Sequence, residues 1–126
     1  MADWLRDMYD TIDAKDLDGF IDALHDDVVV VFANNPPAVG KDQVRGAIGG
    51  FFGTIATMSH NFSNVFTDGD TTILEAVIAY GRLDGPVVDV PCVSILHRDG
   101  ALVDGLRIYL DLTPVFAPLP EAAASA

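Results

Sequence analysis

The sequence predicts an α+β fold in which three helices precede an antiparallel meander. Apolar residues recur at helical spacing over most of the N-terminal part of the chain, whereas from Met58 onward they follow the pattern of strands. The strand-like segments are separated by DGD, LDGP and RDG, which are typical turn sequences. We therefore expect one domain over residues 1–115, followed by a loose tail over 116–126.

The first helix is expected over residues 3–14, with Asp3 as its N-cap and one apolar face. That face consists of Trp4, Leu5, Met8, Tyr9 and Ile12. A second, short helix is expected over 17–25 and a third over 41–55. The third helix contains four glycines, each costing about 1 kcal/mol of helix stability relative to alanine. We interpret them as positions of close packing on a sheet.

Five strands are expected, over residues 28–33, 58–67, 71–83, 87–98 and 101–112. The segment TILEAVIAY is apolar on both faces apart from Glu75. Both faces of the sheet should therefore be covered, one by the helices and the other by a partner subunit. The outward row of Ile73, Val77 and Ala79 lies beside Val93 and Ile95, which predicts a homodimer.

The charge and composition limit the partners of the protein. The formal net charge is −12, which disfavours nucleic acid and acidic substrates. The apolar runs are too short to cross a membrane, and no basic segment precedes a long apolar stretch at Met1, so we expect no signal peptide and no membrane partner. A single cysteine, Cys92, excludes an internal disulfide and is typical of a cytoplasmic protein.

Three segments carry a resemblance to a known family. They are PPAVGKDQVRGAIGGFFGTIATMS at 36–59, TILEAVIAYGRLDG at 72–85 and GLRIYLDL at 105–112. Together with the LDGF turn between the first two helices, they resemble the NTF2-like, or SnoaL-like, cone fold, and within it the limonene-1,2-epoxide hydrolases. The resemblance implies three N-terminal helices packed on a curved, mostly antiparallel sheet, with an apolar pocket inside the cone.

The residues that perform epoxide hydrolysis in that family do not carry over. By the resemblance, the catalytic arginine falls on Ala76, the two carboxylates fall on Ile78 and Ile108, and the water-holding tyrosine and asparagine fall on Val30 and Phe32. Such a carboxylate pair needs one general base and one general acid. All five positions are apolar here, so hydrolysis by the two-carboxylate mechanism is not expected.

Ketosteroid isomerase is a second relative by resemblance, because it shares the fold and a DLDG turn. Its oxyanion tyrosine falls near Met8, one position from Tyr9, and its base aspartate falls near 33–35, where there is no carboxylate. The isomerase mechanism therefore cannot be copied either.

The pocket is expected to be apolar with a few polar groups, as in small-molecule sites. The alternation and the resemblance place the following ligand-binding residues on its walls: Ile12, Val30, Phe32, Phe51, Ile55, Thr57, Ala76, Ile78, Val90, Cys92, Leu106, Ile108 and Leu110, with Ser94 as a further candidate. If their own side chains fill the space, the same residues form a plain core.

Three residues are candidates for catalysis. His60 could act as base or acid near neutral pH, since histidine titrates at about 6.5, and Tyr9 and Tyr80 could donate hydrogen bonds to a substrate oxygen. Each also has an ordinary structural explanation, as a half-solvated histidine or as core aromatics with the hydroxyl at the edge. Cys92 has no nearby cation to activate it, so an inert thiol is expected.

Three functions remain open at this point. The first is an enzyme without cofactor or metal, an isomerase, lyase, cyclase or hydrolase acting on a neutral hydrophobic small molecule. The second is a non-catalytic protein that binds such a molecule. The third is a structural dimer with a collapsed pocket.

Overall fold

The computed structural model describes residues 1–118, which form helices and strands in the order helix–helix–strand–strand–helix and then a strand meander. The elements are α1 (Asp3–Asp13), α2 (Leu17–Asp22), β1 (Leu24–Phe32), β2 (Ala38–Val39), α3 (Gly40–Phe52), β3 (Ile55–Asp68), β4 (Thr71–Arg82), β5 (Val87–Asp99), β6 (Leu102–Leu110) and α4 (Thr113–Phe116). The α+β architecture is confirmed, and most of the expected tail lies in residues 119–126, outside the described part.

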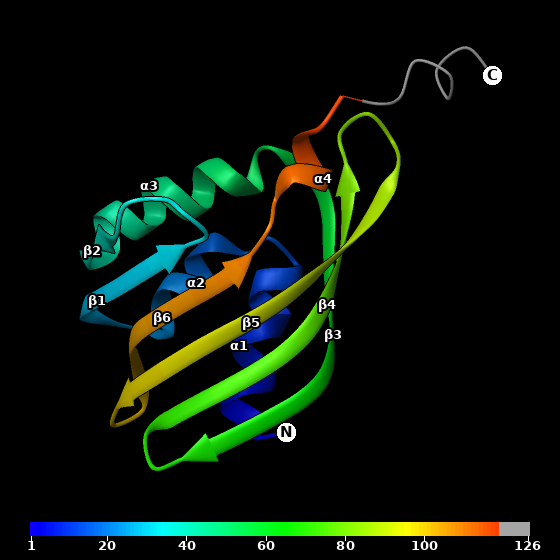
Figure 1. Cartoon of the computed structure of the whole chain (residues 1–126). Helices are drawn as coiled ribbons and strands as arrows, with labels where there is room; N and C mark the ends of the chain where they lie inside the picture. The colour runs from blue at the N-terminus through cyan, green and yellow to red at the C-terminus, as the bar shows by residue number, and fades with distance from the viewer. Residues whose placement is uncertain (119–126) are drawn as a thin grey trace.

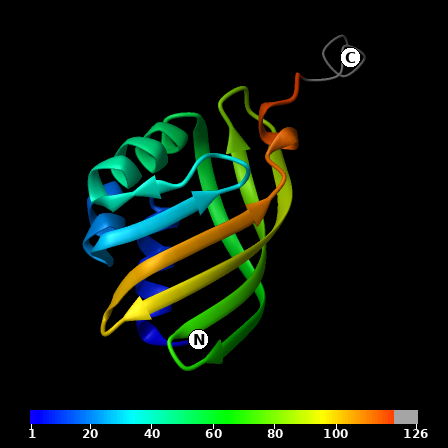
Figure 2. The same cartoon turned by 60° about the vertical axis from the view of Figure 1, so that its left-hand side comes forward.

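All strands belong to one six-stranded sheet in the order β2-β1-β6-β5-β4-β3. Its neighbours are antiparallel except for β1 and β6, which run parallel. The sheet curves strongly around α1 and α2, while α3 lies along β1 (Figures 1 and 2). A cavity lies between the concave face of the sheet and the helices.

The chain reverses between α1 and α2 through a short, well-defined connection. Ala2, not Asp3, is the N-cap of α1, and Asp3 lies in the first turn. Lys15 leaves the helix with φ of 55°, and its Nζ donates to the carbonyl of Ile55 at 2.9 Å. The Asp16 side chain then accepts the Gly19 N–H at 3.1 Å and starts α2.

Tertiary pairing moves several boundaries from their expected places. Residues 24–25 belong to β1 rather than to a helix, because fully buried Leu24 pairs with Val103 of β6. Helix α3 ends at Phe52, and Ile55 begins β3. The short strand β2 and the C-terminal helix α4 were not expected, since two and four residues are too few for a periodic pattern.

The glycines of α3 do not pack on the sheet as expected. An added Cβ at Gly49 would lie 2.9 Å from Leu17 Cδ2 of α2, so the end of the Leu17 side chain would have to move; this glycine packs against α2 and not against the sheet. At Gly46 and Gly50, an added Cβ would meet nothing within 4 Å. These two glycines therefore weaken the helix without a packing reason that the structure shows.

A register shift near the start of β3 decides which of its side chains face the helices. The β3–β4 register is interrupted between Ile55 and Thr57. Beyond this bulge, Met58 pairs with Tyr80 and His60 pairs with Ile78, and all four lie on the concave side. Thr57 is exposed instead of lining the pocket, which corrects the expectation.

The convex face of the sheet carries an apolar patch. Ile73 and Val77 are 40% and 38% exposed and Tyr109 is 52% exposed, while Val93 and Ile95 beside them are half-buried. The β4–β5–β6 register joins Ile73 to Ile95 and Val93 to Tyr109. No element of residues 1–118 covers this face, so the patch is available to a partner.

None of the helices among the described residues is long and apolar enough to cross a lipid bilayer.

We expect a second copy of the chain to cover the convex patch, and Val77→Lys to break the dimer because it places a charge in an apolar interface. Light scattering at micromolar concentration should give the dimer mass for the wild type and half of it for the variant. Val39→Lys, on the opposite edge strand β2, is the matched control and should leave the mass unchanged. A monomeric wild type would contradict this prediction.

Candidate functional site

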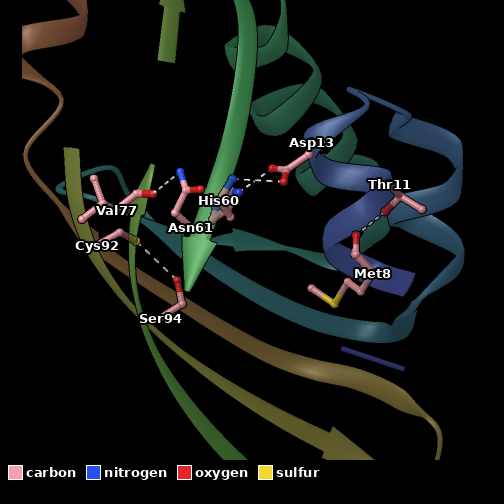
Figure 3. A network of polar contacts seen from close by, with 8 residues as sticks. All are labelled: Met8, Thr11, Asp13, His60, Asn61, Val77, Cys92 and Ser94. Carbon is pink, nitrogen blue, oxygen red and sulfur yellow. Dashed lines mark hydrogen bonds and ion pairs between the residues drawn. The ribbon is translucent and has the colours of Figure 1, made fainter. Parts of the chain in front are cut away.

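The central feature of the site is a hydrogen bond between the side chains of Asp13 and His60. Asp13 Oδ1 lies 2.5 Å from His60 Nδ1, and Asp13 Oδ2 accepts the backbone N–H of His60 at 3.0 Å. Figure 3 shows the carboxylate at the end of α1 facing the histidine on β3. The carboxylate thus holds both the ring and the backbone of one residue across 47 positions of sequence.

The pair combines a buried ring with a partly solvated carboxylate. The His60 side chain is 7% exposed and that of Asp13 is 29% exposed. Asp13 ends α1, and the β3 bulge turns His60 toward it. A carboxylate against Nδ1 favours the tautomer with the proton on that nitrogen, which leaves the Nε2 lone pair free to accept a proton.

His60 is one wall of an apolar cavity between the helices and the concave sheet. The cavity is lined by Tyr9, Ile12, Phe20, Phe32, Ile48, Phe51, Phe52, Met58, His60, Ile78, Tyr80, Ser94, Leu106 and Ile108. Its volume is about 40 Å³. One water molecule needs about 10–15 Å³ of such space, so the cavity is open and has room for a few water molecules.

Two tyrosines supply the remaining polar groups of the cavity. Burial raises the pKa of the Tyr9 hydroxyl, although the nearby Ser94 hydroxyl acts in the opposite sense. Burial also raises the pKa of Tyr80. Both phenols therefore remain protonated at neutral pH and can donate a hydrogen bond. The Tyr9 ring meets the His60 ring edge-on, with 4.8 Å between centroids.

Three polar atoms in this cavity are available to a ligand. Over residues 1–118, every side-chain nitrogen or oxygen that is shut off from open space has a hydrogen-bond partner. Within these residues, His60 Nε2 and the hydroxyls of Tyr9 and Tyr80 form no hydrogen bond, so they border open space. All three residues line the cavity. The site therefore offers one acceptor and two donors on largely apolar walls.

The structure brings together most, not all, of the residues expected in the pocket. The three catalytic candidates line it, together with six of the ligand-binding candidates: Ile12, Phe32, Phe51, Ile78, Leu106 and Ile108. Ile78 and Ile108 are the positions where the resemblance places the missing carboxylates. Apolar side chains therefore face the ligand space at both positions.

The remaining ligand-binding candidates lie outside the cavity. Ile55, Ala76, Val90 and Cys92 are buried in the surrounding core, because the cavity is shorter than the strands that form it. Val30 lines a separate groove, and Leu110 lies at the surface beside α4. Ser94, a further candidate, does line the cavity, and its Oγ lies 3.6 Å from Cys92 Sγ.

Some residues that line the cavity were not predicted from the sequence. Phe20, Ile48 and Phe52 lie on the apolar faces of α2 and α3, and helical spacing alone does not indicate which apolar residues border a cavity. Met58 was missed because the bulge was not anticipated. Asp13 was not predicted as a site residue, because no local pattern links it to His60, 47 positions away.

The other two histidines form exposed ion-pair contacts away from the cavity. His97 Nδ1 lies 2.6 Å from Asp104 Oδ1, and this hydrogen bond raises the pKa of His97. His25 Nε2 lies 3.6 Å from Asp99 Oδ2. Within residues 1–118, no group of three histidine, cysteine, aspartate or glutamate side chains is arranged to hold a metal ion.

Solved structures share this fold at low sequence identity. An NTF2-like protein of unknown function from Burkholderia pseudomallei superposes with a TM-score of 0.82 at 16% identity, covering 91% of this chain and 95% of that chain. A hypothetical protein with a ketosteroid isomerase-like fold from Catenulispora acidiphila, solved in complex with trimethylamine, gives a TM-score of 0.83 at 18% identity, covering 93% of this chain and 92% of that chain. An LEH-like epoxide hydrolase from M. tuberculosis gives 0.75 at 16% identity, covering 97% and 90%. Among curated proteins, no sequence matches this chain significantly.

The family itself is shown by sequence. The model of the SnoaL-like domain matches residues 5–105, which is most of the chain and contains both Asp13 and His60. The superposed structures agree with this match in the helices and in the curved sheet. The protein is therefore a member of the SnoaL-like domain family, with the NTF2-like α+β fold that the resemblance implied.

Proposed function

We propose that the protein is a cofactor-independent enzyme that transfers a proton on a neutral, hydrophobic small molecule, with His60 as the base. The observation that carries this proposal is the Asp13–His60 contact at the wall of an apolar cavity. An isomerase, lyase or cyclase could all use such a base, and a hydrolase could use it to activate water. A non-catalytic binder would need no carboxylate to fix the histidine.

In this proposal, His60, Tyr80 and Asp13 each have a role. His60 Nε2 takes a proton from a carbon next to a carbonyl, and the bonding electrons of that C–H bond move toward the carbonyl oxygen. The Tyr80 hydroxyl, neutral because burial raises its pKa, donates a hydrogen bond to this oxygen. Asp13 stabilises the imidazolium that forms and keeps the ring in place. The proton then returns to another carbon, or a leaving group departs.

The family resemblance and the cavity together limit the chemistry. One base and neutral hydrogen-bond donors can carry out a single proton transfer. They cannot reproduce the paired general base and general acid that two carboxylates provide. The substrate should therefore already be acidic at carbon. Its neutral charge follows from the apolar walls and from the formal net charge of −12.

A probe reaction can test the base without knowledge of the substrate. In nitrobenzisoxazole, a base removes the single proton of the isoxazole carbon, the nitrogen–oxygen bond breaks, and a coloured cyanonitrophenolate forms. We expect the wild type to accelerate this elimination and His60→Ala to lose ~10²–10⁴-fold in kcat/KM. A wild-type rate equal to that of His60→Ala would overturn the proposal.

The role of Asp13 is to position His60, and it predicts a split between kinetic constants. Asp13→Asn should lower kcat for the same probe by at least about tenfold with little change in KM, since the variant disturbs the ring and not the binding walls. Asp10→Asn is the matched control, because Asp10 is exposed on the same helix and should not affect either constant. Equal losses in both variants would show a general charge effect instead.

Nucleophilic catalysis by Cys92 is not part of this proposal. Burial raises the pKa of its thiol, with the Ser94 hydroxyl acting in the opposite sense, so little thiolate exists at neutral pH. We expect a disulfide reagent such as dithionitrobenzoate to react with Cys92 far more slowly in the native protein than in denaturant. Rapid reaction of the native protein would show that the thiol is accessible and activated.

A further inference from the structure

We propose that the site extends beyond the inner cavity into an adjacent groove, and that Phe51 separates the two and so determines which ligands fit. This inference rests on the proposed function, because it takes the cavity at His60 as the reactive end. The ligand is an elongated, neutral, hydrophobic molecule. Its reactive end lies against His60 and Tyr80, and the remainder lies in the groove.

The small volume of the inner cavity supports an extension of the site into the groove. Sites for small molecules usually measure about 300–1,000 Å³, whereas the inner cavity measures about 40 Å³. A neighbouring groove of about 300 Å³ lies between β1, β2 and α3. The inner cavity alone is far below this range, whereas the groove alone reaches its lower limit, so a ligand that contacts His60 needs space beyond the inner cavity.

The two spaces share walls. The groove is lined by Val30, Phe32, Asn35, Pro36, Ala38, Ala47, Ile48, Phe51 and Leu112. Phe32, Ile48 and Phe51 also line the inner cavity, so these three side chains form the partition. Removing one of them would join the spaces directly.

Phe51 is the member of the partition that can move most easily. Ile48 is buried, and Phe32 belongs to the sheet, whereas Phe51 is half-buried near the end of α3. Its ring lies 4.8 Å from that of Phe32, 5.7 Å from that of Tyr80 and 6.4 Å from that of Phe116, between centroids. These contacts are tilted or edge-on, and Phe116 itself is exposed, so a ligand ring can replace them.

The helix around Phe51 is also weak. Gly50 precedes it, and Gly53 follows the end of α3. A side chain at Gly50 would meet nothing within 4 Å, so no neighbour requires glycine at this position. Glycine is a poor helix former, and the last turn can therefore shift to let the Phe51 ring turn aside.

The walls of the groove define the ligand class. Apart from Asn35, the lining side chains are apolar, and the Asn35 Nδ2 already donates to the carbonyl of Phe32 at 2.9 Å. A second ring or an alkyl chain suits this surface, while a charged tail would lose its hydration without a partner.

The test uses N-phenylnaphthylamine, a neutral probe with two aromatic units that fluoresces in apolar surroundings. Phe51→Ala should bind it with a Kd lowered by about tenfold or more relative to the wild type. Adding Ala47→Trp, which fills the groove from an exposed position of α3, should abolish the gain. Phe66→Ala, on an exposed phenylalanine of β3, is the matched control and should leave the Kd unchanged.

The outcomes separate this inference from the proposed function. A Phe51→Ala Kd within about twofold of the wild type, or a gain that survives Ala47→Trp, would overturn the shared site. If circular dichroism shows that Phe51→Ala is unfolded, Phe51→Leu replaces it, with a smaller gain expected and the same Ala47→Trp criterion. His60→Ala should keep the binding gain of Phe51→Ala. If the wild type fails to accelerate the elimination but Phe51→Ala still binds the fluorescent probe more tightly, the proposed catalysis is wrong and the shared site stands.

Discussion

The concave face of the sheet carries apolar side chains on each of its central strands, and their burial under the helices is the constraint on which the rest of the structure depends. Leu74 and Ile78 of β4, Val90 of β5 and Leu106 of β6 are all at most 1% exposed. This burial supplies most of the stability. It also makes any charged group inside the cone expensive. The polar groups inside the cone are therefore few, and they are either neutral or hydrogen-bonded to a partly solvated partner.

The position of the base follows from this constraint. His60 pairs with Ile78 across β3 and β4, so the histidine lies beside the position where the resemblance places the first carboxylate of the epoxide hydrolases. Strand β3 is an edge strand of the sheet and lies next to α1. A base on this strand can reach a carboxylate at the end of α1, whereas a base on β4 would be surrounded by apolar neighbours. In the proposed mechanism, the proton acceptor therefore lies on an edge strand of the sheet and not at its centre.

The sequence allowed the concave rows of β4 and β6 to be predicted, because strict alternation identifies which face a residue occupies. It allowed His60 to be chosen as the base candidate, because few residue types titrate near neutral pH. It could not reveal Asp13 as the partner, since the contact joins residues 47 positions apart and depends on the curvature of the sheet. Thr57 was misplaced for a related reason: a β-bulge changes the facing side chain and leaves no local signature in this segment.

The apolar replacements at Ala76, Ile78 and Ile108 are best understood as one linked change. A carboxylate at Ile78 or Ile108 would border the apolar cavity, where burial would favour its neutral form unless a cation lay nearby. Ala76, the position of the family's arginine by resemblance, supplies no cation. Losing the arginine would therefore disfavour both carboxylates, and apolar side chains at all three positions avoid that cost. In the proposed mechanism, His60 takes the role of the general base without the cost of a buried charge, because a neutral imidazole carries none. Its partner Asp13 remains partly in contact with solvent. Charge would then form in the cavity only during proton transfer, when Asp13 is already in place to stabilise it.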